Sequence, residues 1–91
     1  MHVMLTVSIG EEASEQALQD FYGYMHQQGW TRLNPSTTFR AQFEDRATRV
    51  GAIATARGDV RKAAATAGIQ RFEAAAEVGP EPPAVWDDTY L

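Results

Sequence analysis

The segment from Ser8 to Trp30 constrains the fold most, because it carries a helix start, an apolar stripe and a helix stop. Ser8 and Glu11 fit a capping box at its start. Gly29 fits the left-handed position that follows a helix, which lets Trp30 fold back onto Met25. Apolar residues recur at helical spacing along the segment: Ala13, Ala17, Leu18, Phe21, Tyr24 and Met25. The pattern predicts one amphipathic helix of about five turns, which needs an apolar surface to lie on.

Alternating segments on both sides of this helix offer that surface. Residues 2–9, 37–44 and 70–78 each alternate apolar and polar side chains, which is typical of a half-buried strand. The side chains expected to face inward are Val3, Leu5, Val7 and Ile9, then Phe39, Ala41 and Phe43, then Phe72, Ala74, Ala76 and Val78. Gly68 is expected to end a second helix that precedes the last of these strands.

The segment from residue 46 to residue 67 has two interpretations. As one long helix, it carries Gly51 and Gly58 inside, and each costs roughly 1 kcal/mol relative to alanine. As a strand over residues 47–56 followed by a helix, it uses Gly58 as a turn and Asp59 as the N-cap, positions that these residues favour. Against this second interpretation, Arg61 and Lys62 then lie near the positive end of the helix dipole. We prefer the second interpretation because it avoids both helical glycines.

The resulting order is strand, helix, strand, strand, helix, strand. With right-handed crossovers it predicts an α+β, ferredoxin-like βαββαβ sandwich, in which two helices cover one face of a four-stranded antiparallel sheet. Residues 1–79 form this domain. Residues 80–91 are a proline-rich acidic tail, since Pro80, Pro82 and Pro83 cannot continue a central strand.

The composition narrows the setting of the protein. The chain of 91 residues has no cysteine, so it has no disulfide framework and no thiolate chemistry. Its N-terminal segment lacks a basic region, and no apolar run approaches membrane-spanning length. We therefore expect a cytoplasmic protein that does not contact a membrane. The alanine richness and the seven arginines against one lysine fit a bacterial source by association. All eight basic residues fall within residues 32–71, between two acidic segments, so a local basic patch is possible although the net charge is -4.

Three arginines are expected on the open face of the sheet: Arg40, Arg49 and Arg71. Guanidinium groups bind phosphates and carboxylates in two-pronged fashion, so this set suits an acidic protein partner, a nucleic acid or a small anion. The alternative is a face that is solvated or buried in a dimer, with ion pairs between its strands. RNA recognition of the RRM type needs aromatic residues on the central strands, where this sequence has Met4 and Ile53.

The sequence has no convergent catalytic set, metal-binding spacing or cofactor motif. Tyr22 and His26 are four residues apart on the first helix and form the nearest approach to an acid–base pair. A histidine in the last turn of a helix is, however, explained by the helix dipole alone. We therefore expect no catalytic residue, no bound metal and no cofactor.

The acidic tail contains three large side chains that a solubilising segment would not need: Val85, Trp86 and Tyr90. The prolines before them set an extended backbone, which lowers the entropy lost when the segment docks on a surface. We expect these side chains to dock on a partner or on the basic region of the same or a second subunit.

The initial strand and helix, followed by the run from Gly29 to Phe39, resemble the small ferredoxin-like ribonuclease superfamily. That superfamily includes the CRISPR-adaptation small nuclease, the VapD-type ribonucleases and the GhoS-type antitoxins. The resemblance implies a homodimer whose C-terminal segment crosses to its partner. In the nucleases an aspartate near the end of the first strand binds the metal, whereas this sequence has Val7, Ser8, Ile9 and Gly10 there.

Three functions are consistent with these features. The first is a small non-enzymatic interaction protein, antitoxin-like or inhibitor-like, which forms a homodimer and binds through its sheet face and tail. The second is a ribonuclease of the superfamily named above. The third is a module that binds an anion or another small ligand through Arg40, Arg49 and Arg71.

Overall fold

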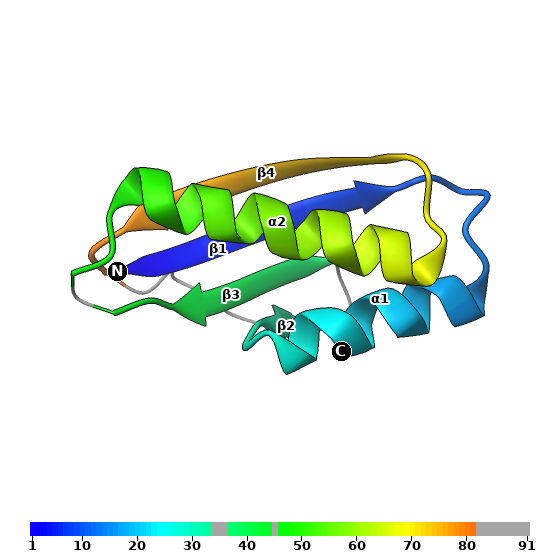
Figure 1. The fold of residues 1–91 in the computed structure, drawn as a ribbon, viewed down its shortest axis with the longest axis horizontal. Helices are drawn as coiled ribbons and strands as arrows, with labels where there is room; N and C mark the ends of the chain where they lie inside the picture. Colours follow the sequence, from blue (N-terminus) through cyan, green and yellow to red (C-terminus); the bar gives the residue numbers. More distant parts are fainter. Residues whose placement is uncertain (34–36, 45, 82–91) are drawn as a thin grey trace, which may run out of the picture.

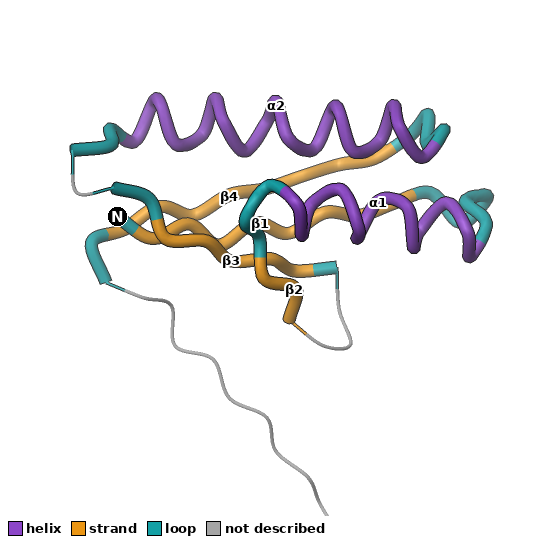
Figure 2. The backbone as a smooth tube through the Cα atoms, turned by 60° about the horizontal axis from the view of Figure 1, so that its bottom comes forward, coloured by secondary structure: helices purple, strands orange, loops and turns teal. Residues whose placement is uncertain are grey.

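The computed structural model describes residues 1–33, 37–44 and 46–81. In chain order the elements are β1 (His2–Ile9), α1 (Glu15–Gln27), β2 (Thr31–Leu33), β3 (Thr38–Gln42), α2 (Arg49–Ala67) and β4 (Phe72–Gly79). The four strands form one antiparallel sheet in the order β2-β3-β1-β4 (Figure 1). Both helices lie on the same face of this sheet (Figure 2). The predicted ferredoxin-like fold class is therefore confirmed.

The first helix begins later than the sequence pattern predicts. Its N-cap is Ser14, whose hydroxyl oxygen accepts a hydrogen bond from the backbone N–H of Ala17 at 3.0 Å. The capping box at Ser8 is wrong, because β1 continues to Ile9 and pairs there with β4. Pairing with a neighbouring strand thus takes precedence over a local capping signal.

The predicted end of α1 is confirmed. Gly29 has a φ of 94°, and the N–H of Trp30 donates to the carbonyl oxygen of Met25 at 3.1 Å. The N–H of Gly29 donates to the carbonyl oxygen of His26, which completes a Schellman motif. This motif turns the chain so that the Trp30 side chain enters the core, where it is 2% exposed.

The preferred interpretation of residues 46–67 is wrong, because residues 49–67 form one helix. Thr48 caps its start, and Asp59 lies in its interior. Seven alanines in this helix favour the helical state and offset the two glycines. Its buried residues recur three or four positions apart, which a strand cannot reproduce: Ala52, Ala56, Val60, Ala63 and Ala64. Gly68 ends the helix with a φ of 72°, as predicted.

The fourth strand comes from a part of the chain where no strand was predicted. Thr31–Leu33 pairs with β3 as a hairpin and takes the place of the strand expected at residues 47–56. Three residues are too few for an alternating pattern to be recognised. The strands predicted at residues 37–44 and 70–78 appear with slightly different bounds as β3 and β4.

The core lies between the sheet and the helices. Its fully buried large side chains come from β1, α1, β3 and α2: Val3, Val7, Phe21, Met25, Phe39 and Val60. The rings of Phe21 and Phe39 pack with their centroids 6.1 Å apart. The buried residues of α2 are mostly small alanines, which let that helix lie close to α1. No helix within the described ranges is long and apolar enough to cross a lipid bilayer.

Candidate interaction surfaces

The sheet face opposite the helices is the first candidate surface. Side chains alternate along each strand, so every second side chain points into the core. The side chains between them lie on the opposite face of the sheet, which we call the open face. From β2 to β4, across the sheet, the open face comprises Thr31, Leu33, Thr38, Arg40, Gln42, His2, Met4, Thr6, Ser8, Glu73, Ala75 and Glu77. Of these, His2, Met4, Leu33 and Thr38 are half-buried and the others are exposed.

One row of the open face places opposite charges on either side of an apolar side chain. In the strand register, Met4 lies directly between Arg40 on β3 and Glu77 on β4. Arg40 and Glu77 are exposed, while Met4 is half-buried. An unbranched thioether adapts its shape to different surfaces. The row therefore offers a cation, an adaptable apolar contact and an anion in succession.

The three predicted arginines do not converge on one site. Arg40 lies on the open face, but Arg49 is the first residue of α2 and therefore lies outside the sheet. The expectation that Arg49 shares the sheet face followed from the strand predicted at residues 47–56 and is corrected with it. Arg71 lies next to Gly10, just beyond the end of β1, whereas Arg40 pairs with Met4, six residues earlier in the chain. At about 3.3 Å per residue, Arg40 and Arg71 are too far apart to hold one phosphate.

The predicted tail contacts cannot be placed on this surface. Val85, Trp86 and Tyr90 lie outside the described residues, so their docking stays a prediction.

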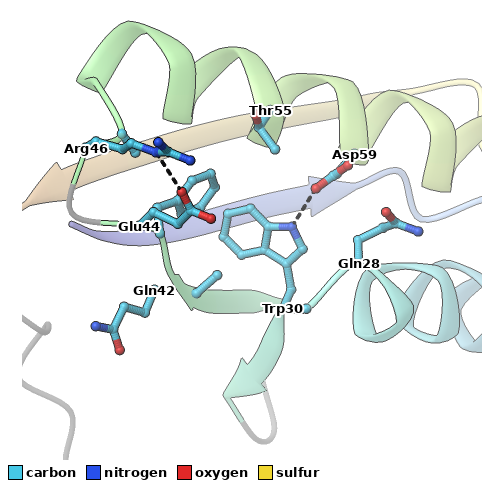
Figure 3. Close-up of a pocket in the computed structure, with 11 residues that line it drawn as sticks. Gln28, Trp30, Gln42, Glu44, Arg46, Thr55 and Asp59 are labelled. Atoms are coloured by element: carbon cyan, nitrogen blue, oxygen red, sulfur yellow. Dashed lines mark hydrogen bonds and ion pairs between the residues drawn. The ribbon is translucent and has the colours of Figure 1, made fainter.

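A second candidate surface is a hollow of about 440 Å³ at the end of β3 (Figure 3). Its lining includes Trp30, Phe43, Ala47 and Asp59. β2 pairs with Thr38–Arg40 of β3. The hollow lies beyond this paired segment, beside Ala41 and Gln42, where the described part of β2 does not cover the edge of β3.

The polar groups of this hollow are mostly paired with one another. The indole N–H of Trp30 donates to Oδ2 of Asp59 at 2.9 Å, and the Phe43 ring contacts the indole edge-on with centroids 6.1 Å apart. Nε of Arg46 lies 3.2 Å from Oε2 of Glu44. Both partners of that ion pair are largely exposed, so it adds little free energy. The hollow thus combines apolar lining residues with three charged ones, Glu44, Arg46 and Asp59, which together carry one net negative charge.

Sequence reasoning missed this hollow because it assigned Asp59 to a helix start. On one continuous helix, Thr55 and Asp59 are four residues apart and share a face. That spacing, together with a tryptophan placed by the Schellman motif, was the signal that could have found it.

Tyr22 and His26, the pair considered for acid–base chemistry, have different surroundings in the structure. The guanidinium carbon of Arg32 lies 3.8 Å from the centroid of the Tyr22 ring, which also packs against Phe39. His26 is exposed in the last turn of α1. Tyr22 thus takes part in packing and a cation–π contact.

Across the described ranges, no three side chains of the metal-binding types form a group that would hold an ion.

Comparison with known proteins identifies no relative of this chain. No protein-family model, no curated protein and no solved structure matches the chain.

Proposed function

We propose that this chain is a small non-enzymatic regulatory protein, antitoxin-like or inhibitor-like, that acts as a homodimer and binds a partner protein through the open face. The observation that carries the proposal is the row of Arg40, Met4 and Glu77 on a sheet face that neither helix covers.

The charges on the open face favour a protein over a nucleic acid as its partner. A phosphate backbone is bound by several cations together, whereas this face combines Arg40 with Glu73 and Glu77. A protein surface carries charges of both signs, so it can complement such a mixed row. Complementary charges then contribute to the choice of partner and to the association rate.

Site-specific photo-crosslinking in cells that make the native protein tests this proposal. A photoreactive amino acid replaces Thr6 on the open face or Thr66 on α2, both of which are exposed. We expect a discrete crosslinked partner from position 6 that is lost in the Arg40→Glu variant. Position 66 is the matched control and should not give the same product. The same product from both positions, or no dependence on Arg40, contradicts binding at the open face.

A nuclease assay tests the enzymatic alternative. The purified protein is incubated with single-stranded RNA and DNA, with and without magnesium or manganese. We expect no cleavage. Cleavage that persists in clean preparations and disappears in His26→Ala or Glu11→Ala would overturn the non-enzymatic proposal.

A further inference from the structure

β4 leaves a row of backbone groups without a neighbouring strand in the described sheet. The strand order places β4 at one edge, paired on its other side with β1 along all eight of its residues. The N–H of Gly10 donates to the carbonyl oxygen of Arg71 at 3.2 Å, so the backbone groups of Arg71 point toward β1. Because backbone groups alternate along an antiparallel strand, those of Phe72, Ala74, Ala76 and Val78 point away from the sheet.

This edge has few of the features that protect the edges of monomeric proteins. Phe72–Gly79 contains no proline or lysine, and its one-to-one register with β1 shows no bulge. Natural monomers interrupt a long straight edge with such features, because exposed backbone groups recruit another strand. Glu73 and Glu77 are its only charges, and both lie on the open face.

The helix side of the same edge is apolar apart from Arg57. A cavity of about 210 Å³ lies between α2 and the inner face of β4, lined by Ile53, Val60 and Phe72 among others. Val50, near the start of α2, is 77% exposed. The edge therefore presents both unpaired backbone groups and apolar side chains to a neighbour.

We propose that a second copy of this chain occupies the edge, with its β4 antiparallel to the first and the two-fold axis at Ala74. This register places Arg71 of each copy opposite Glu77 of the other, while Glu73 faces Ala75. Opposite charges facing each other across two strands stabilise the pairing, and like charges destabilise it. The two Arg71–Glu77 pairs thus select this register and the second copy as the occupant.

The neighbouring symmetric registers are less favourable. An axis at Glu73 or at Glu77 places that glutamate opposite itself, and an axis at Ala75 places Glu73 opposite Glu77. An axis at Ala76 places both glutamates of β4 opposite uncharged residues and pairs Arg71 only with Glu81, which follows Pro80 beyond the end of the strand. With the axis at Ala74, the outward groups of Phe72, Ala74 and Ala76 form about six backbone hydrogen bonds between the copies.

The dimer would be one continuous eight-stranded sheet with all helices on one side and both open faces on the other. The inference deepens the homodimer of the proposed function and rests on that part of it alone. Crosslinking from Thr6 tests partner binding at the open face, and the oligomeric state of the variants below tests the β4 dimer. Either proposal can therefore fail while the other stands.

Charge reversal tests the register. Sedimentation equilibrium should give the full chain about twice its 10.0 kDa mass. Glu77→Arg and Arg71→Glu should each raise the dimer dissociation constant about tenfold, since each affects two pairs. The double variant restores opposite charges and should return the constant to within about threefold of the original. Glu73→Arg is the matched control on the same strand face and should change it by less than about threefold.

Proline substitution tests the edge itself. Ala74→Pro should give a folded monomer, because the N–H of Ala74 points away from β1. Ala75→Pro is the matched control and should lower the melting temperature, because its N–H points toward β1. Circular dichroism establishes that the Ala74→Pro chain is folded.

Three results would overturn the inference. The first is a full chain that stays monomeric at 100 µM. The second is a dimer that is insensitive to both single charge reversals and to Ala74→Pro. The third is a dimer that is lost in a chain ending at Glu81 but withstands the charge reversals, which would assign the contact to residues 82–91.

Discussion

The indole N–H of Trp30 donates a hydrogen bond to Oδ2 of Asp59 over 2.9 Å, and so ties the end of α1 to the middle of α2. The two residues are 29 positions apart in the chain. Trp30 is 2% exposed, and Asp59 is half-buried on the rim of the hollow at the end of β3. A buried N–H that loses its acceptor carries a desolvation cost, so this bond holds the two helices in one relative position.

Asp59→Ala should therefore lower the free energy of unfolding by about 1–2 kcal/mol. Loss of the acceptor costs about 1–3 kcal/mol, and the higher helix propensity of alanine returns up to about 0.7 kcal/mol. Urea unfolding followed by circular dichroism measures the change. Thr66→Ala, at an exposed site on the same helix, is the control: it gains the same helix propensity without losing an acceptor and should raise stability by up to about 0.7 kcal/mol.

A double-mutant cycle with Trp30→Phe separates the hydrogen bond from other effects of Asp59. In the Trp30→Phe background, no indole N–H is present and Asp59→Ala should be nearly neutral. An equal loss of stability in both backgrounds would show that Asp59 acts through something other than Trp30.

Gly58→Ala should stabilise the protein by about 0.5–1 kcal/mol, because Gly58 lies inside α2, where alanine loses less backbone entropy. A methyl group at this position meets no atom within 4 Å. Gly68→Ala is the opposite control, since a φ of 72° is unfavourable for alanine and should cost about 1–2 kcal/mol. Thermal melting of the two variants in opposite directions confirms the continuous helix. A loss of stability in Gly58→Ala would instead favour a turn at that position.

Ser14→Ala should destabilise the protein by about 1 kcal/mol, because its hydroxyl caps α1. Ser8→Ala should change stability by less than about 0.5 kcal/mol, because Ser8 is exposed on β1. Urea unfolding of both variants compares the cap seen in the structure with the one suggested by the Ser8 and Glu11 spacing. The reverse order of effects would mean that the helix begins near Ser8.

The fold class was predictable because several independent signals agree on it. The alternation of β1 and β3, the stripe of α1 and the glycines after both helices each appear in the sequence and in the structure. What was not predictable depends on tertiary contacts. Residues 49–67 are helical through a buried face made mostly of alanine, which has little hydrophobic contrast with its surroundings. β2 exists through its pairing with β3, over only three residues.

The same limit applies to the candidate surfaces. The alternation of β3 was sufficient to place Arg40 on the open face, but the grouping with Arg49 depended on a strand that does not form. Met4 lies between Arg40 and Glu77 only because of strand order and register, which periodicity alone does not reveal. The Trp30 and Asp59 contact likewise needs the relative placement of two helices.

The tail carries Trp86, which lies outside the described residues, so its docking is expected from the sequence alone. We expect Trp86 to dock on an apolar surface, since a tryptophan side chain buries 150–250 Å² when it does so. Trp30 and Trp86 are the only tryptophans, so subtracting the fluorescence of Trp86→Phe from that of the full chain isolates Trp86. A docked indole emits at shorter wavelength than a solvated one and is shielded from iodide. Emission and quenching equal to those of free tryptophan amide would contradict docking. Trp86→Phe leaves the core indole of Trp30 in place as an internal reference.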